Sequence, residues 1–321
     1  MIRAAVLNAC GTPPTITERP APVPADGKVT ITVEAVPITP LDLLCASGTS
    51  YFGRPTTPYV PGVQGVGRLA DGSAVWFGTS AGMRSGVDGS MATTVAVPSV
   101  DVVALPSGVP LTLLAALGLS AVAAHAALTH GGGLAAGDQV IVLGAGGVVG
   151  QAAVQLALLG GARRVIAVAR SASARARAEE LGAAVAIPLL PDDDVASMAD
   201  RLRDVADGPV DLVLDPVFGV PAAAALRVLR PGGRLVNLGS AAGATAPIES
   251  AVLRGGSLHV VGYTNNGLST AQRATALGVV AGHAAAGRLT VDHEVVPFDS
   301  VADAWARQDA GTAAGRLVLA L

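Results

Sequence analysis

A glycine-rich turn between two apolar segments is the part of this sequence best suited to chemistry. Residues 140–143 are β-branched or aliphatic, the turn Gly144-Ala-Gly-Gly-Val-Val-Gly150 follows, and apolar residues then recur at helical spacing as far as Leu159. Glycine lets the backbone approach phosphates closely, and free N–H groups at a helix start attract an anion. A strand, tight turn and helix in this order predict a pyrophosphate site for a dinucleotide. The alternative is an ordinary strand-to-helix turn in a protein that binds nothing.

The spacing of these glycines differs from the common G-x-G-x-x-G pattern. The residue three after Gly146 is Val149, so the pattern reads A-x-G-x-x-G when it starts at Ala145. A side chain at Gly147 or Gly150 would obstruct the ligand or the packing of the helix on the strand. The predicted cofactor-binding residues of the turn are Gly144, Ala145, Gly147, Val148, Val149 and Gly150.

The end of the next strand bears on which dinucleotide is bound. This strand, residues 164–168, is followed by Ala169, Arg170 and Ser171 rather than by an acidic residue. An acid there would bond the ribose hydroxyls of NAD and repel a 2′-phosphate. Arg170, Ser171 and Arg175 could instead hold that phosphate by charge and hydrogen bonds, so we expect NADPH rather than NADH. The alternative is that these arginines belong to a solvated helix start.

Length and composition limit the class of protein. The chain has 321 residues, enough for two domains of ordinary size, and 51% of them are hydrophobic. A formal net charge of −3, without a long basic run, argues against nucleic acid as a partner. The two cysteines, Cys10 and Cys45, indicate no disulfide framework, and the N-terminus lacks the layout of a signal peptide. We therefore expect a soluble cytoplasmic protein.

One apolar stretch, residues 111–128, approaches the roughly 20 residues of a membrane span. It is rich in Ala, contains Gly118, Ser120 and His125, and is not followed by a basic flank. Buried helices near a domain junction are the better interpretation, and we expect no membrane partner.

The chain divides into parts with different periodicity. Residues 1–110 contain short alternating runs rich in Val, Thr, Pro and Gly, which predict a mostly antiparallel β-domain folded as a partial barrel. From residue 111, strands and helices alternate as far as a strand at 257–262, which predicts a doubly wound parallel sheet. Within it, residues 231–233 (Pro-Gly-Gly) are expected to end a helix and start a strand. The tail, residues 263–321, is expected to return to the first domain.

Together these features resemble the medium-chain dehydrogenase/reductase superfamily, and within it the zinc-independent quinone oxidoreductases related to zeta-crystallin. The resemblance implies an α/β protein in which a Rossmann dinucleotide-binding domain, residues 111–262, is inserted into a GroES-like catalytic domain, residues 1–110 and 263–321. It also implies a homodimer that pairs through the edge strand at 257–262. Its markers are the glycine turn, Pro61-Gly-Val-Gln-Gly-Val-Gly67, Ala116-Leu-Gly-Leu-Ser-Ala121 and Arg230-Pro-Gly-Gly-Arg-Leu-Val236.

The resemblance also bears on zinc. Zinc-dependent members place a Cys three residues before an Asp, where this chain has Thr39 before Asp42, and a His-Glu pair where it has Val63 and Gln64. Their four-cysteine structural lobe is missing from the sequence. Because a catalytic zinc needs three N, S or carboxylate ligands and an open position, we expect no metal.

Hydride transfer without a metal suits an acceptor that is already electron-poor, such as a quinone or an α,β-unsaturated carbonyl (an enone). The resemblance implies that Tyr51 lines the substrate side, where it could donate a hydrogen bond to a developing oxyanion, and that Thr39 lies near the nicotinamide. The alternative for Tyr51 is a surface or packing residue. Asp42 is interpreted as a structural hydrogen-bonding partner rather than a general acid.

The remaining cofactor contacts follow from the fold rule that ligands lie beyond the carboxyl ends of the strands, and from the resemblance. Ser120 matches a family Ser or Thr near the nicotinamide amide, and its alternative is a helix-buried hydroxyl bonded to the backbone. The further predicted cofactor-binding residues are Ser120, Val217, Gly239, Ser240 and Tyr263.

Two other functions stay open at this point. One is a reductase that acts on a specialised biosynthetic intermediate. The sequence does not separate it from a quinone or enone reductase, because specificity lies in the loops at 49–61 and 265–269. The other is a non-catalytic NADPH-binding protein, which a broken phosphate site would favour. The glycine turn is intact in the sequence.

Overall fold

The computed structural model describes residues 1–23, 25–84 and 86–321, which form two compact units. The terminal unit consists of Met1–Leu119 and Thr270–Leu321, and the central unit of Ser120–Ser269. The boundaries expected from the sequence, after residues 110 and 262, lie a few residues earlier. The first observed boundary falls inside a helix, α2 (Leu111–Ala126), which runs from one unit into the other.

The terminal unit is built on β-sheets, as its alternating runs predict. Its larger sheet has the strand order β14-β15-β3-β4-β5-β7, and β6 pairs with β3. β14 lies parallel to β15, and the other neighbours in this sheet are antiparallel. The strands of this unit are β1 (Ile2–Val6), β2 (Thr15–Arg19), β3 (Lys28–Pro37), β4 (Gln64–Arg68), β5 (Ala74–Gly78), β6 (Thr94–Pro98), β7 (Val102–Ala104), β14 (His293–Pro297) and β15 (Arg316–Ala320).

Helices and a shared apolar core close the terminal unit. Its helices are α1 (Pro40–Ser47), α8 (Thr270–Ala285) and α9 (Val301–Asp309), with single 3-10 turns at Ser99–Asp101 and Phe298–Ser300. Ile31 and Val33 of β3 pack in one core with Phe77 of β5, Trp305 of α9 and Leu317 of β15. The C-terminal strand therefore belongs to the same core as the N-terminal strands, and the tail returns to the first domain.

The central unit is a doubly wound parallel sheet, and the α/β fold class is confirmed. The strand order is β10-β9-β8-β11-β12-β13, and all its pairs are parallel. The order reverses between β8 and β11, so the topological switch point lies there. The strands are β8 (Gln139–Leu143), β9 (Arg164–Ala169), β10 (Val185–Pro188), β11 (Val210–Asp215), β12 (Leu229–Asn237) and β13 (His259–Gly262).

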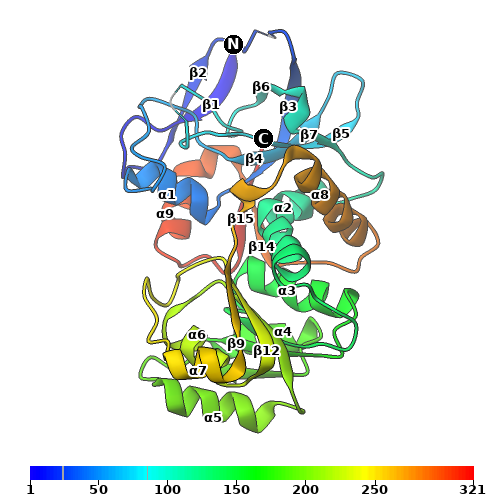
Figure 1. The fold of residues 1–321 in the computed structure, drawn as a ribbon. Helices are drawn as coiled ribbons and strands as arrows, with labels where there is room; N and C mark the ends of the chain where they lie inside the picture. The colour runs from blue at the N-terminus through cyan, green and yellow to red at the C-terminus, as the bar shows by residue number, and fades with distance from the viewer. Residues whose placement is uncertain (24, 85) are drawn as a thin grey trace. The chain divides into compact units, whose positions relative to one another are not determined.

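Helices cover both faces of this sheet (Figure 1). They are α3 (Val148–Leu159), α4 (Ala172–Glu180), α5 (Val195–Val205), α6 (Gly219–Leu226) and α7 (Ser250–Gly256), with a 3-10 turn at Asn265–Gly267. α3 and α4 make the connections on one side of β8, and α5 and α6 pack on each other. β13 is the edge strand with exposed His259 and Val260, and pairing of two copies through it stays a prediction.

Helix α2 is broken at Gly118 and continues into a π-helical turn, Ala127–Gly131. Gly118 has φ 28° and ψ −129°, and a Cβ there would lie 2.1 Å from Oε1 of Gln64, so any other residue would strain the backbone and displace the Gln64 amide. Among the described residues, the stretch Leu111–Gly131 is long and apolar enough to cross a membrane, but 67% of its most apolar window is buried inside the protein. That degree of burial is typical of the core helix of a soluble protein.

The prediction for residues 231–233 is wrong. α6 ends at Leu226, and Pro231, Gly232 and Gly233 lie inside β12 rather than in front of it. The register between β11 and β12 shifts between Val210 and Leu212, and Gly232 has φ 73°. A turn-like tripeptide is therefore absorbed as an irregularity within a strand, because the flanking residues still pair with β11.

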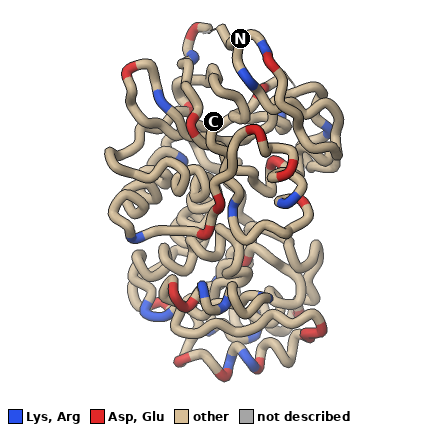
Figure 2. Tube along the Cα trace, turned by 180° about the vertical axis from the view of Figure 1, so that it is seen from behind, with Lys and Arg blue, Asp and Glu red and all other residues tan. Residues whose placement is uncertain are grey.

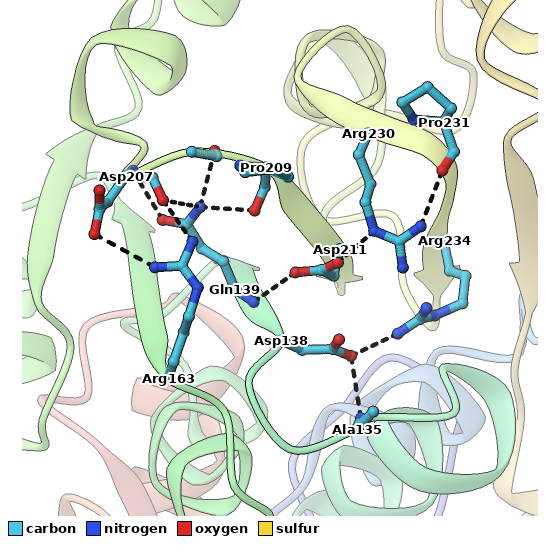
Figure 3. Close-up of polar contacts among 11 residues, drawn as sticks. Ala135, Asp138, Gln139, Arg163, Asp207, Pro209, Asp211, Arg230, Pro231 and Arg234 are labelled. Atoms are coloured by element: carbon cyan, nitrogen blue, oxygen red, sulfur yellow. Dashed lines mark hydrogen bonds and ion pairs between the residues drawn. The ribbon is translucent and has the colours of Figure 1, made fainter.

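Side-chain contacts tie the amino ends of β8, β11 and β12 together (Figure 3). Nη2 of Arg234 lies 2.7 Å from Oδ2 of Asp138, and Nε of Arg230 donates to Oδ1 of Asp211. Asp211 also accepts a hydrogen bond from the Gln139 N–H at 2.8 Å. Elsewhere, Lys, Arg, Asp and Glu are interspersed along the trace (Figure 2). Arginine–aspartate pairs thus cross-link the parallel strands at the end opposite to their carboxyl termini.

Replacing Arg234 with Met should lower the free energy of unfolding by about 1–2 kcal/mol, because it leaves the mostly buried Asp138 carboxylate without its cation. The side chains of the pair are 21% and 10% exposed, so the loss stays below that of a fully buried pair. Urea denaturation measures the change. Arg203→Met is the matched control, since its pair with Asp200 is 57% and 69% exposed and should cost less than about 0.5 kcal/mol. Equal losses in both variants would contradict the assignment of stability to this cross-link.

Candidate functional site

The glycine turn folds back on itself at the carboxyl end of β8. The Ala145 N–H donates to the carbonyl of Val168 in β9 at 2.9 Å, and the Gly147 N–H to the carbonyl of Gly144 at 3.2 Å. A Cβ atom on Gly150 would lie 2.4 Å from the Gly144 carbonyl oxygen and 2.6 Å from Cα of Ala145. Any side chain at position 150 would therefore force the turn and the helix apart.

The start of α3 has the properties of an anion site. Its N-cap is Gly147, and no side chain of the described residues caps it. The first N–H groups of a helix have no intrahelical partner, so those of Val148, Val149 and Gly150 are available to a ligand. Gly146 and Gly147 are exposed. The turn thus offers backbone donors and the positive end of a helix dipole where a pyrophosphate is predicted.

The segment after β9 supplies one uncommitted cation. Ser171 caps α4, because its Oγ accepts from the Ala174 N–H at 3.1 Å. Nη1 of Arg175 donates to the carbonyl of Arg170 at 2.8 Å and so holds the backbone at the strand end. The Arg170 side chain is exposed, and no ion pair or hydrogen bond occupies it within the described residues. Of the two predicted arginines, Arg170 is the one with a free guanidinium.

The other predicted cofactor residues gather at the same edge of the sheet. Val217, two residues after β11, lies against the turn: a Cβ on Gly144 would be 2.7 Å from its Cγ1. Gly239 follows β12 and lies against the carbonyl of Pro216, and a Cβ there would be 2.5 Å from that oxygen. Ser240 is exposed beside it.

Tyr263 follows β13, and its N–H donates to the carbonyl of Asn237 at 2.8 Å. Its hydroxyl donates to Oδ1 of Asn265 at 2.8 Å. Burial raises the pKa of Tyr263 to about 12, so the phenol stays protonated at neutral pH. Ser120 is half-buried in α2, two residues after the break at Gly118, and its role at the cofactor stays a prediction.

Thr39 and Asp42 form a reciprocal cap at the start of α1 in the terminal unit. Oδ2 of Asp42 accepts from the Thr39 N–H at 2.8 Å and from its hydroxyl at 2.6 Å, and the Asp42 N–H donates to Oγ1 of Thr39 at 3.2 Å. Oδ1 of Asp42 accepts from the Val63 N–H at 2.9 Å. Asp42 is therefore a structural partner, as interpreted from the sequence. The single proton of the Thr39 hydroxyl is already donated, so Thr39 acts on a substrate only as an acceptor while this cap persists.

Burial is the largest cause of the pKa shifts of the two charged residues near this cap, Asp42 and Arg316. Burial raises the pKa of Asp42, against the hydrogen bonds from Thr39 and Val63 and the attraction of Arg316. Burial likewise lowers the pKa of Arg316 to about 10, against the attraction of Asp42. Nη1 of Arg316 donates to the carbonyl of Ile38 at 2.8 Å. The Asp42 carboxylate and the Arg316 guanidinium thus hold the backbone of the loop that leads into α1 by hydrogen bonds.

Tyr51 lies on the surface of the terminal unit. Its side chain is 75% exposed, and its ring centroid is 4.2 Å from that of Phe52 at an interplanar angle of 38°. The exposed hydroxyl is compatible with both sequence-based interpretations, contact with a substrate or a surface role, and the catalytic role stays a prediction.

The positions at which zinc-dependent members have their ligands do not fit zinc. Thr39 donates its proton to Asp42, and Val63 is aliphatic. Oε1 of Gln64 accepts from Nε1 of Trp76 at 3.0 Å and from the Leu119 N–H at 2.7 Å, and the side chain is 1% exposed. Across the described ranges, no group of three or more His, Cys, Asp or Glu side chains is placed to hold a metal ion.

Sequence reasoning missed Asp215, the last residue of β11. It is fully buried and accepts three hydrogen bonds at the edge where the predicted cofactor residues gather. The available signal was an acidic residue that ends an apolar strand directly before Pro216.

A family model and curated proteins of similar sequence indicate a dehydrogenase or oxidoreductase family. A family model described as zinc-binding dehydrogenase matches residues 148–280, which excludes positions 39, 63 and 64. The human synaptic vesicle membrane protein VAT-1 homolog is 33% identical over 237 residues, 71% of this chain and 58% of that protein. Human quinone oxidoreductase is 29% identical over 224 residues, 68% of this chain and 66% of that protein. The chain therefore spans less than two thirds of the length of these curated relatives.

A solved structure matches the whole chain. The quinone oxidoreductase of Thermus thermophilus, described together with its complex with NADPH, superposes with a TM-score of 0.83. It is 30% identical and covers 99% of this chain and 100% of that one. The chain belongs to the medium-chain dehydrogenase/reductase superfamily and is related to its quinone oxidoreductases, as the sequence resemblance predicted.

Replacing Gly150 with Ala should lower the free energy of unfolding by about 1–3 kcal/mol, because the new methyl group overlaps the backbone of Gly144 and Ala145. Thermal and urea denaturation measure the change. Gly278→Ala is the control: this exposed glycine of α8 has nothing within 4 Å of a Cβ, so the substitution should stabilise the helix by about 0.5–1 kcal/mol. A Gly150→Ala protein as stable as the wild type would contradict the close approach.

Proposed function

We propose that this protein is an NADPH-dependent, metal-free oxidoreductase that transfers hydride to a quinone or an α,β-unsaturated carbonyl. The observation that carries the proposal is the uncapped start of α3 beside the glycine turn, with an uncommitted arginine at the end of the next strand. These features offer one site for a pyrophosphate and one for a 2′-phosphate. The Thermus relative described with NADPH supports the same cofactor.

The chain's own groups account for binding and orientation. The N–H groups of Val148, Val149 and Gly150 would hold the pyrophosphate, and Arg170 with Ser171 would hold the 2′-phosphate. Val217, Gly239 and Tyr263 would wall the crevice beyond the strand ends. When bound, NADPH supplies the hydride to an electron-poor carbon. The protein's contribution to rate is then mainly orientation of the reactants and exclusion of water.

The metal-free part of the proposal rests on the donor set. The groups at positions 39, 63 and 64 are a hydroxyl bonded to Asp42, an aliphatic chain and an amide bonded to Trp76 and the Leu119 N–H. A quinone or enone accepts hydride without a Lewis acid on its oxygen, whereas a simple ketone lacks that electron deficiency. The acceptor class follows from this difference.

NADPH oxidation should therefore be observed with benzoquinone, a naphthoquinone or an enone, and not with a simple ketone. Turnover should be unchanged by a chelator, because no step uses a metal. Absorbance at 340 nm follows the reaction. Turnover of a ketone that the chelator abolishes would refute the metal-free assignment. If NADPH binds but none of the acceptors reacts, a specialised intermediate or a non-catalytic role replaces this proposal.

Replacing Arg170 with Glu should raise the Kd for NADPH roughly 10- to 100-fold, because a charge-assisted hydrogen bond to the 2′-phosphate is replaced by repulsion. The Kd for NADH should change less than about threefold, because that cofactor has no 2′-phosphate. Titration of intrinsic fluorescence measures both. Arg203→Glu, the same charge change on α5, should leave both values unaltered. Equal weakening of NADPH and NADH by Arg170→Glu would remove this residue from the phosphate site.

A further inference from the structure

A buried carboxylate shapes the turn that follows β11. Asp215 has no exposed surface, and its Oδ1 accepts hydrogen bonds from the Val217 N–H at 3.0 Å and the Phe218 N–H at 2.7 Å. Its Oδ2 accepts from Nδ2 of Asn237 at 2.9 Å. Burial raises the pKa of Asp215, against the hydrogen bonds from Phe218, Asn237 and Val217. The fold therefore bears the desolvation cost of a carboxylate at this position.

The turn itself is strained. Phe218, the N-cap of α6, has φ 57° and ψ −157°, a backbone conformation that is almost exclusive to glycine. Its N–H is one of those that Asp215 holds, and its side chain packs against the apolar core of the central unit. A side chain in this conformation persists only when its surroundings over-determine it, and such residues concentrate at functional sites.

Asn237 connects this turn to the end of the next strand. Besides the carboxylate, its Nδ2 donates to the carbonyl of Asp215 at 3.2 Å and to the carbonyl of Gly239 at 2.8 Å. All three partners are acceptors, which fixes the orientation of the amide. The strand ends at Asp215 and Asn237 are thus locked to each other by one side-chain pair.

The position of Asp215 and Asn237 in the sheet indicates which half of a bound dinucleotide they would lie beside. β11 is the neighbour of β8 across the topological switch point, and Val217 lies against Gly144 of the phosphate-binding turn. In a doubly wound sheet the dinucleotide lies across this crevice, with one half on each side. The strand order β8-β9-β10 places Arg170 on the adenosine side, so the turn after β11 lies on the nicotinamide side.

We propose that Asp215 and Asn237 are positioning residues for the nicotinamide half of the cofactor. They act through the backbone, by holding residues 216–218 in a strained turn that presents Val217 as the wall of the crevice beside Gly144. The inference rests on the proposed function, because it requires that a dinucleotide binds here. It assigns two separate roles: Arg170 binds the adenosine half of the cofactor, and Asp215 with Asn237 shapes the site for the nicotinamide half.

The test compares a whole cofactor with a fragment. Asp215→Asn keeps the shape but turns one acceptor into a donor that faces the Asn237 amide. It should raise the Kd for NADPH about tenfold, the loss of roughly one hydrogen bond to a charged group. The Kd for adenosine 2′,5′-bisphosphate, which lacks the nicotinamide half, should not change. Arg170→Glu should weaken both ligands. Titration calorimetry on the purified full-length protein measures all of these values.

Asp211→Asn is the matched control, because Asp211 lies near the opposite end of the same strand and is bonded to Arg230 and Gln139. It should lower the melting temperature and leave both dissociation constants unchanged. If Asp215→Asn binds NADPH like the wild type, or weakens NADPH and the fragment equally, the pair is merely structural and the inference is overturned.

A milder variant covers the case in which Asp215→Asn does not fold. Asn237→Ser retains a hydroxyl that can donate to one of the three acceptors, and it should raise the Kd for NADPH about threefold with no change for the fragment. An unchanged NADPH affinity here would also overturn the inference. A wild-type protein that binds neither ligand would instead refute the proposed function, so the two failures are distinguishable.

Discussion

Backbone crowding at the start of α3 is the constraint on which the site in the central unit depends. Gly150 lies so close to Gly144 that a single methyl group would separate the helix from the strand end. This contact makes β8, the turn and α3 one rigid piece, with the helix amides beside the strand terminus. The neighbouring strand ends then pack on that piece, through Val168 on one side and Val217 on the other. The site is consequently built mostly from backbone.

Because the site is built mostly from backbone, local patterns in the sequence could predict much of it. Glycine spacing and strand–helix alternation are local signals, so the doubly wound sheet, the strand 210–215 and the turn at 144–150 follow from them. Local signals fail where the surroundings decide. Pro231, Gly232 and Gly233 read as a turn, but pairing with β11 absorbs them into a strand. The unit boundary also lies inside α2, because the helix continues past the break that Gly118 introduces.

Side-chain partners were the least predictable part, because residue type and spacing do not show which of several nearby groups a polar side chain contacts, even when the partner is only three to five residues away. Thr39 reads as a free hydroxyl, yet its proton is donated to Asp42, three residues away, and Asp42 is held in turn by Val63. Arg170 and Arg175 are alike in sequence, but the second is used to hold the backbone of the first. Only the three-dimensional arrangement shows which polar groups remain available to a ligand.

The two ends of β11 differ in what holds them, with an ion pair at the amino end and a strained turn beside the proposed cofactor site at the carboxyl end. At the amino end, Asp211 is bonded to Arg230, and the pair cross-links β11 to β12. At the carboxyl end, backbone and amide N–H groups hold Asp215, and the neighbouring residue Phe218 is kept in a conformation that glycine normally takes. Neither the burial of the Asp215 carboxylate nor the backbone conformation of Phe218 favours the folded state by itself, because both cost free energy. In the proposed complex, both fix the shape of the crevice before the dinucleotide arrives, so that less ordering has to be done on binding.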